Sequence, residues 1–404
     1  MLVAAAVYAL RDPTFLGADF RAFYTAGTFL RTGRSAELYD VDAAGRFQAD
    51  VLGARGVSAW LSPPYWAWVY VPLSRLPFVP ALFVHSAIAV ALGLVALTLL
   101  ERELGVLRRS EMAWVAACYY PTLQGFIDGQ NTALWALLLT GVFVLLRRGR
   151  DGAAGVALGC FALKPQLAVG LVAALLGARR MRSLAVAALT AGAWVATGYL
   201  TLPAAMRDYV TKTVDFGAYL RSAGYPVAGL HGLFQLGPLL LDAFSPRAAT
   251  AIGAVLTALA LAALVAIWAT RRWEPGEASW DRRMAATLAL STLASPHLFG
   301  YDLMLLLVPL FIVWRLYPRG TEERPLDGGP ILGVTALGWG LALVGPALTV
   351  AQQGVSRWAF QKSIALQLEV PVTGLWIWLV YRSALDDPGK SPAGDGDRGS
   401  IARA

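Results

Sequence analysis

The chain has 404 residues, of which 57% are hydrophobic and 15% are charged, and its mean hydropathy is +0.55. A soluble domain carries about 25% charged residues, so this composition excludes an ordinary globular protein. The formal net charge of +8 does not indicate nucleic-acid binding, because the basic residues lie in short loops between apolar runs. The sequence predicts an all-α, polytopic membrane protein.

The first apolar run is short, and a polar cluster follows it. Residues 1–10 are too few to cross about 30 Å of hydrocarbon, so we expect an upstream start or a first helix that is partly missing. Gly17-Ala18-Asp19-Phe20 comes next, before a helix with aromatic residues on one side. Asp19 fits two roles: a general base that deprotonates a hydroxyl, or the N-cap of that helix. This helix, a second over 42–51 and a third over 207–220 are expected to lie along the membrane surface and to form a platform above a lipid-accessible cavity.

Apolar segments long enough to span a membrane occupy most of the remaining chain. The clear candidates are 79–100, 183–202, 247–270, 330–350 and 362–381. The stretches 111–146 and 283–316 are too long for one helix, and polar residues split each of them into two. The stretch 152–177 is either one span with Lys164-Pro165 at its centre or two short helices that meet there. With the first run included, the second interpretation gives about twelve membrane helices.

The basic residues favour two short helices over 152–177. That topology places six basic segments on one side of the membrane, and they hold 20 of the 34 lysines and arginines. The segments are 101–110, 147–151, 179–182, 271–283, 315–324 and the tail after 381. A single span would separate the arginines of 179–182 from those of 147–150, against the positive-inside rule. We therefore predict an integral-membrane domain over 1–385 with both ends cytoplasmic, and a disordered cytoplasmic tail over 386–404.

Five polar clusters interrupt the apolar runs, and this topology brings all of them to the non-cytoplasmic face. They are Gly17–Phe20, Ser62–Tyr65, Asp128–Asn131, Lys164–Gln166 and Ser295–Asp302. Polar groups at membrane depth are energetically expensive, so such clusters are candidate functional sites. If they meet, they form one site.

Two cations in these clusters have alternative interpretations. Lys164 is the only lysine before Thr211, and it either neutralises a phosphate or extends its ammonium group to the interface. His297 follows Pro296 at a helix break, where it binds phosphate, shuttles a proton or caps a helix. No histidine pair has metal-ligand spacing, and no phosphate-binding or dinucleotide-binding loop occurs. The sequence thus predicts no metal and no cofactor.

In their order and spacing, the five clusters resemble glycosyltransferase family 87, the membrane mannosyltransferases that use polyprenyl-phosphate-mannose. The resemblance implies a GT-C fold with its active site on the non-cytoplasmic face. It also implies a catalytic aspartate in the first outer loop, a position that only Asp19 matches. The implied reaction moves a hexose, with mannose expected, from a polyprenyl-phosphate-linked sugar donor to a lipid or glycan acceptor with inversion. The implied location is the plasma (inner) membrane, with the active site facing the periplasm or cell exterior.

On this resemblance, Lys164 and His297 are the candidates for binding the donor phosphate. The candidate sugar or acceptor contacts are Tyr65, Gln130, Asn131, Gln166, Tyr301 and Asp302. The partners would be the donor, the acceptor and membrane lipids, with no nucleic acid.

Two other functions stay open. A transporter or lipid flippase could place a midplane site around Lys164, although Lys164-Pro165 has no counterpart in the second half of the chain. A non-catalytic assembly partner would not need Asp19 at all. The enzyme predicts Asp19, Lys164 and His297 around one cavity, whereas a carrier predicts a site open to both faces.

Overall fold

The computed structural model describes residues 17–105, 108–214, 229–315, 328–361 and 363–385. Across these residues the protein is helical, and its only β-type pairing is an isolated bridge between Leu230 and Phe299. The all-α prediction is therefore confirmed. The first apolar run, the tail over 386–404 and the end of the predicted helix over 207–220 lie outside the described residues.

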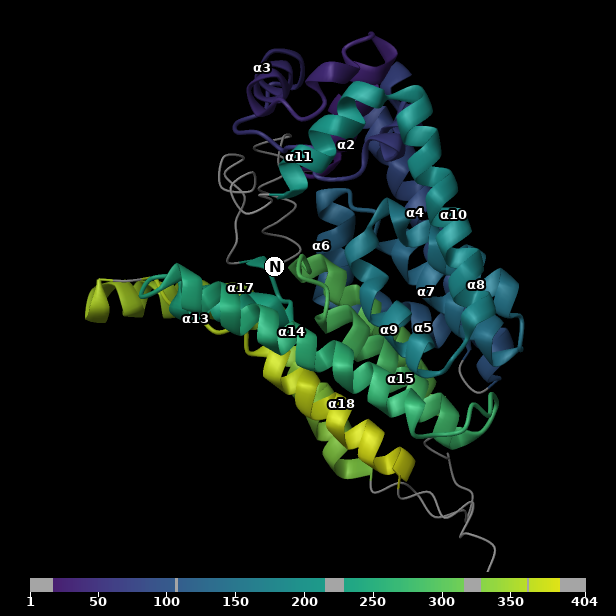
Figure 1. Ribbon diagram of the computed structural model, residues 1–404. Helices are drawn as coiled ribbons and strands as arrows, with labels where there is room; N and C mark the ends of the chain where they lie inside the picture. Colours follow the sequence, from purple (N-terminus) through teal and green to yellow (C-terminus); the bar gives the residue numbers. More distant parts are fainter. Residues whose placement is uncertain (1–16, 106–107, 215–228, 316–327, 362, 386–404) are drawn as a thin grey trace, which may run out of the picture.

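Four described helices are long and apolar enough to cross a membrane (Figure 1). They are α4 (Phe78–Leu104), α10 (Met181–Thr201), α14 (Pro246–Ala269) and α17 (Gly328–Phe360). Large apolar side chains point outward from them: Phe83 on α4 is 70% exposed and Leu200 on α10 is 84% exposed. Such exposure suits lipid rather than water. The count of about twelve membrane helices stays a prediction.

The other helices are shorter, and several meet at polar breaks. They are α5 (Arg109–Cys118), α6 (Tyr120–Asp128), α7 (Thr132–Arg147), α15 (Ala278–Leu293), η8 (Gly300–Leu306), α16 (Leu307–Arg315) and α18 (Glu369–Leu385). The predicted splits in 111–146 and 283–316 are confirmed. A further break at Tyr119 was not predicted; it precedes Pro121, which lacks the N–H that a continuous helix would need.

Residues 152–177 form a hairpin of two short helices, as the arginine pattern predicted. Helix α8 (Asp151–Gly159) and helix α9 (Val169–Gly177) are joined by the 3₁₀ turns η4 (Cys160–Leu163) and η5 (Pro165–Leu167). Arg180, after α9, forms an ion pair with Asp151 at the start of α8. The chain therefore enters and leaves the hairpin at the same end, and Lys164 lies at its tip.

The other basic segments meet at this same end of the molecule. The contacts that join them are Arg147–Glu103 (2.7 Å), Arg147–Asp281 (2.9 Å), Arg315–Asp281 (2.9 Å) and the Arg282 guanidinium to the Ser383 carbonyl (2.6 Å). Five of the six predicted segments are linked in this way, and the sixth, 179–182, joins through Arg180. Their common side agrees with the predicted topology, although the compartment that they face stays a prediction.

Short helices and turns gather at the opposite end from the basic segments, and α2, α3 and α11 among them lie near the top of Figure 1. They include α2 (Phe20–Arg31), η1 (Ser35–Glu37), α3 (Val41–Leu52), η2 (Pro64–Tyr70), η3 (Leu73–Arg75), α11 (Pro203–Val214), η7 (Leu233–Gln235) and α13 (Leu236–Leu241). The three predicted outer helices exist as far as they are described. However, ten of the twelve residues of α2 are buried, so α2 packs inside the protein instead of lying on the membrane surface.

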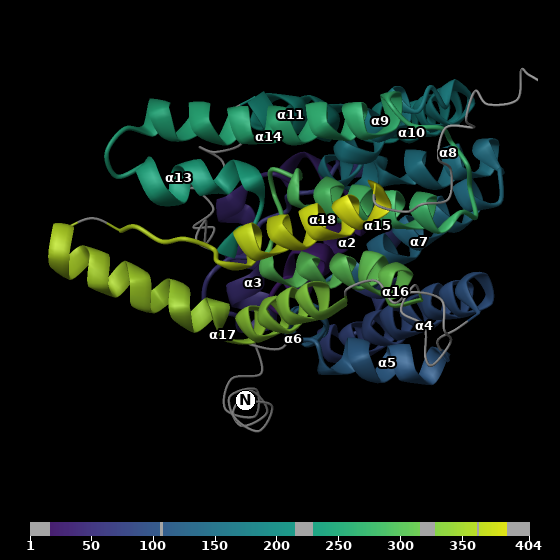
Figure 2. The same ribbon diagram turned by 90° about the horizontal axis from the view of Figure 1, so that it is seen from below.

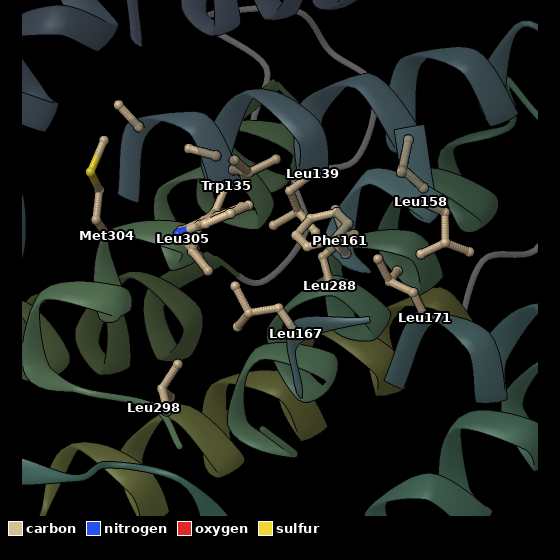
Figure 3. Packing of buried hydrophobic residues seen from close by; sticks show 14 of the residues in the cluster. Trp135, Leu139, Leu158, Phe161, Leu167, Leu171, Leu288, Leu298, Met304 and Leu305 are labelled. Carbon is tan, nitrogen blue, oxygen red and sulfur yellow. The ribbon is translucent and has the colours of Figure 1, made fainter. Parts of the chain in front are cut away.

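The hairpin packs against four helices: α8 lies beside α10 and α7, and α9 lies beside α14 and α15 (Figure 2). Figure 3 shows its Phe161 and Leu167 beside Trp135 of α7 and Leu288 of α15, and all four are buried. Lipid tails are as apolar as these side chains, so close packing rather than the hydrophobic effect must hold such a core together. This packing fixes the hairpin tip beside the start of α7.

Gly155 and Gly159 allow α8 to approach α10 closely. We expect Gly159 to be sensitive to the addition of a single methyl group. A Cβ at Gly159 would collide with Thr190 on α10, whereas Gly192 on α10 faces open space. Gly159→Ala should therefore lower the free energy of unfolding by about 1–3 kcal/mol, as overpacking does. Gly192→Ala should leave it unchanged or raise it, since Ala favours helix. Thermal unfolding of both variants in the same detergent checks this, and equal midpoints would contradict it.

Candidate active site

The polar clusters meet in one cleft that encloses about 720 Å³. Seven of the nine predicted site residues line it: Asp19, Gln130, Asn131, Lys164, Gln166, His297 and Tyr301. Residues of the 58–63 segment and Tyr209 of α11 also line the cleft, as a platform over a cavity would. Tyr65 and Asp302 do not reach it.

Asp19 is positioned by backbone hydrogen bonds to the end of α6. Its N–H donates to the Asp128 carbonyl at 3.0 Å, and the Gly17 N–H donates to the Ile127 carbonyl at 2.8 Å. The Asp19 carboxylate makes no capping bond to α2 but accepts a hydrogen bond from Gln130 Nε2 at 2.5 Å. Asp19 therefore occupies the N-cap position of α2 without capping the helix through its side chain, and the carboxylate lines the cleft.

Burial raises the pKa of the Asp19 carboxyl above 3.8, its ordinary value. Hydrogen bonds from Gln130 and Tyr301 and the nearby charges of Arg21 and Lys164 act in the opposite direction but do not cancel the effect of burial. A carboxylate with a raised pKa holds a proton more strongly than an exposed one, which makes it a better general base near neutral pH.

Lys164 is held by an ion pair with Asp302. Its Nζ lies 2.6 and 2.7 Å from the two carboxylate oxygens, and the Asp302 side chain is fully buried. Asp302 also accepts a hydrogen bond from the Phe299 N–H at 3.2 Å. One carboxylate thus fixes both the hairpin tip and the turn that carries Tyr301. Asp302 does not line the cleft itself, and its predicted contact with the sugar or acceptor stays a prediction.

His297 is buried at the break between α15 and η8. Burial and the charge of Lys164 lower its pKa to about 3, so the imidazole is neutral at physiological pH. The turn around it is held from outside, because His231 N–H donates to the Leu298 carbonyl at 2.6 Å and Gln235 Nε2 donates to the Pro296 carbonyl at 3.0 Å. His297 can therefore offer a hydrogen bond in the cleft, but not a positive charge.

Two tyrosines of η2 support the cleft from behind. Tyr70 donates its hydroxyl proton to Asn131 Oδ1 at 2.8 Å, so the amide oxygen of this cleft residue is already used as an acceptor. Tyr65 donates to the Ala162 carbonyl at 2.7 Å and so ties η2 to the hairpin. Tyr65 has a structural contact here, and its predicted contact with sugar or acceptor stays untested.

An aromatic wall was missed by the sequence analysis. Trp66 and Trp135 both line the cleft, with ring centroids 6.0 Å apart. Aromatic faces suit packing against the apolar side of a sugar ring. This position could not be predicted from the two tryptophans alone, because tryptophans in membrane proteins usually mark the membrane–water interface. Among the described residues no three His, Cys, Asp or Glu side chains form a metal-type cluster, and the absence of a metal stays a prediction.

These features define an integral membrane protein with long lipid-exposed helices and a polar, ligand-sized cleft at one end of the bundle. The sequence model of glycosyltransferase family 87 matches residues 60–296, which is more than half of the chain, and the chain belongs to this family. The match includes Gln130, Asn131, Lys164 and Gln166, and it ends next to His297; Asp19 lies outside it. No curated protein and no solved structure matched the chain. Family membership identifies the protein as a glycosyltransferase.

Proposed function

We propose that the protein transfers a hexose, with mannose as the expected sugar, from a polyprenyl phosphate to a lipid or glycan acceptor with inversion. The observation that carries this proposal is the placement of Asp19, Lys164 and His297 around one cleft, with the Asp19 carboxylate turned away from its helix. The proposed location is the plasma (inner) membrane, with the cleft facing the periplasm or cell exterior. A transporter or flippase is not favoured, since the family is one of glycosyltransferases.

Inversion requires one displacement and one base. The Asp19 carboxylate takes the proton of an acceptor hydroxyl, and the hydroxyl oxygen forms a bond to the anomeric carbon. The bond between that carbon and the phosphate oxygen breaks on the opposite face of the ring, and its electron pair leaves with the polyprenyl phosphate. A general base at this step typically contributes a factor of about 10²–10⁴ in rate.

The leaving phosphate gains negative charge and needs stabilisation. Lys164 is the only lysine or arginine that lines the described cleft, and its ammonium group has three donors, not all of which Asp302 can occupy linearly. His297, being neutral, would add a hydrogen bond from a ring N–H. Asp302 acts through Lys164 and is a positioning residue. The half-buried amide groups of Gln130, Asn131 and Gln166 line the cleft and would bind hydroxyls of the sugar or acceptor.

Reconstituted protein tests the proposal directly. Purified protein in nanodiscs would be given polyprenyl-phosphate-[¹⁴C]mannose and a bacterial lipid extract, with polyprenyl-phosphate-glucose as the alternative donor. We expect a labelled glycolipid whose anomeric configuration, determined by NMR, is opposite to that of the donor. A product with retained configuration would reject the single displacement. No product from either donor would reject the proposed donor class.

Gln130 should tune the pH dependence of transfer. Its hydrogen bond stabilises the ionised form of Asp19 and lowers the carboxyl pKa, so Gln130→Leu should raise that pKa further. Since only the ionised carboxylate is a base, the acid limb of the kcat/KM profile should move to higher pH. Gln166→Leu is the matched control, because Gln166 lines the cleft without a described hydrogen bond to Asp19. An unmoved limb in Gln130→Leu would contradict the assignment of this limb to Asp19.

A further inference from the structure

A second cavity lies behind the turn that carries Tyr301. It encloses about 700 Å³ between α6, η8, α17 and the start of α18. Tyr301 lines the catalytic cleft, whereas its neighbours Phe299 and Gly300 line this second cavity, so the turn separates the two. The walls of the second cavity include the polar side chains of Gln124, His231, Gln353 and Glu369.

An apolar cavity continues from the second one. It encloses about 580 Å³ and shares Leu303 and Glu369 with its polar neighbour. Its walls are mostly leucine, valine and aromatic side chains, with Trp339 and Trp376 among them. The two cavities therefore form a polar compartment and an apolar compartment on either side of one carboxylate, which is the arrangement that an amphiphile requires.

The side chain of Glu369 is buried between the two cavities without a described hydrogen-bond donor for one of its oxygens. Glu369 is the first residue of α18 and is 4% exposed, and its carboxylate packs over Gly345, where no side chain would fit. No donor among the described residues lies within hydrogen-bond distance of its Oε2. An unpartnered buried acceptor is destabilising by about 1–3 kcal/mol, and more when charged, so a ligand that donates a hydrogen bond here recovers that energy.

The charge of the walls limits the ligand. No lysine or arginine is among the described residues that line either cavity, and burial lowers the pKa of His231 to about 4, which keeps that imidazole neutral. Glu369 would repel a phosphate, whereas hydroxyl groups can donate to its carboxylate and to the amide oxygens of the glutamines. The walls therefore select an uncharged, hydroxyl-rich headgroup.

The second cavity also lies close to the proposed base. Gln124 lines it and hydrogen-bonds Asp128, whose carbonyl accepts from the Asp19 N–H. Gln124 and Asp128 are four residues apart on α6, a rise of about 6 Å along the helix. A headgroup seated beside Gln124 is thus about one helical turn from the residue that anchors Asp19.

We infer that these two cavities form the acceptor site of the enzyme, and that the acceptor is a lipid with an uncharged polyol or sugar headgroup. The headgroup occupies the polar compartment and donates to Glu369, and the hydrocarbon chain lies against Trp339 and Trp376. The reacting hydroxyl extends past the turn at Tyr301, whose side chain lines the cleft and hydrogen-bonds Asp19. The donor phosphate is directed instead to Lys164, in the other cleft. This inference rests on the proposed function, because it names the second substrate of that reaction.

The test uses two amphiphiles of equal chain length, tritiated decyl mannoside and tritiated decyl phosphate. Binding is measured on full-length Asp19→Asn protein in nanodiscs, so that no transfer consumes the probe. Glu369→Leu should raise the Kd of decyl mannoside at least about tenfold, which is the loss expected when a hydrogen bond to a charged group is removed. Binding of decyl phosphate should not weaken. Glu369→Gln, which keeps a hydrogen-bonding group, should bind decyl mannoside within about threefold of the parent.

Leu375→Ala is the matched control, because Leu375 lies on the same helix, is 46% exposed and lines neither cavity. Gln353→Leu is a second variant, on α17, for the case that Glu369→Leu does not fold. It should also raise the Kd of decyl mannoside. Unchanged decyl mannoside binding in folded Glu369→Leu or Gln353→Leu protein, or no binding to the parent, overturns the inference. Glu369-dependent binding without sugar transfer by wild type would instead reject the proposed function and leave the cavity as a binding site.

Discussion

Replacing Asp19 with asparagine is expected to reduce sugar transfer by a factor of about 10²–10⁴, the contribution of a positioned general base. Asparagine has nearly the same size and keeps a hydrogen-bonding oxygen for Gln130, but it cannot accept the acceptor's proton. The donor should still bind with unchanged affinity, because the phosphate is held elsewhere in the cleft. Single-turnover transfer from labelled polyprenyl-phosphate-mannose, together with donor binding, separates these two effects.

The matched control for this experiment is Asp40→Asn. Asp40 also precedes a helix, but its carboxylate accepts from the Ala43 N–H at 2.9 Å and caps α3, outside the cleft. Its replacement should change the free energy of unfolding little, because asparagine caps helices about as well as aspartate, and should leave the transfer rate intact. If Asp19→Asn instead transferred sugar at a rate near that of wild type, Asp19 would not be the base. His297 would then be the remaining candidate in the cleft, since Asp302 does not line it.

The gathering of the polar clusters could be predicted because it depends only on topology. Positive-inside bias decided that residues 152–177 fold back on themselves, and the ion pair between Arg180 and Asp151 confirms the hairpin. Once the basic segments share one end, every polar break must emerge at the other. The sequence therefore predicted the helical class, the hairpin and the set of residues that meet, without any knowledge of distances.

The details that failed depend on contacts between residues far apart in the chain. The aromatic side of α2 indicated a surface helix, but η2 and η3 cover its other face, and Gly27 packs directly against the Tyr70 backbone. The pairing of Lys164 with Asp302 joins residues 138 positions apart. Hydrophobic periodicity describes one element at a time, so neither contact leaves a local signal.

The roles of Asp19 and Asp302 were also beyond the sequence for a physical reason. A carboxylate that precedes a helix can serve either as an N-cap or as a general base. Likewise, a carboxylate such as Asp302 can either contact a ligand or form an ion pair. Only side-chain direction separates these alternatives. In the structure, Asp19 lines the cleft and accepts from Gln130, whereas Asp302 does not line the cleft and pairs with Lys164.

The ion pair between Lys164 and Asp302 predicts the second large effect. Lys164→Met should abolish detectable transfer and also lower the free energy of unfolding by about 3–5 kcal/mol, because it leaves the Asp302 carboxylate buried without a counter-charge. Lys212→Met, on the exposed face of α11, removes the same charge from a site outside the cleft and should change neither quantity appreciably. Thermal unfolding and the transfer assay on the same preparations measure both.

The double variant Lys164→Met/Asp302→Leu separates the structural role of Lys164 from its proposed role at the phosphate. Replacing both members of a buried ion pair with apolar groups is often neutral or stabilising, so the double variant should regain most of the stability that Lys164→Met loses. It should not regain transfer, because the leaving phosphate still lacks its cation. Recovery of transfer together with stability would show that Lys164 only holds the hairpin against η8. Recovery of stability alone is the result expected if the ammonium group acts on the departing polyprenyl phosphate.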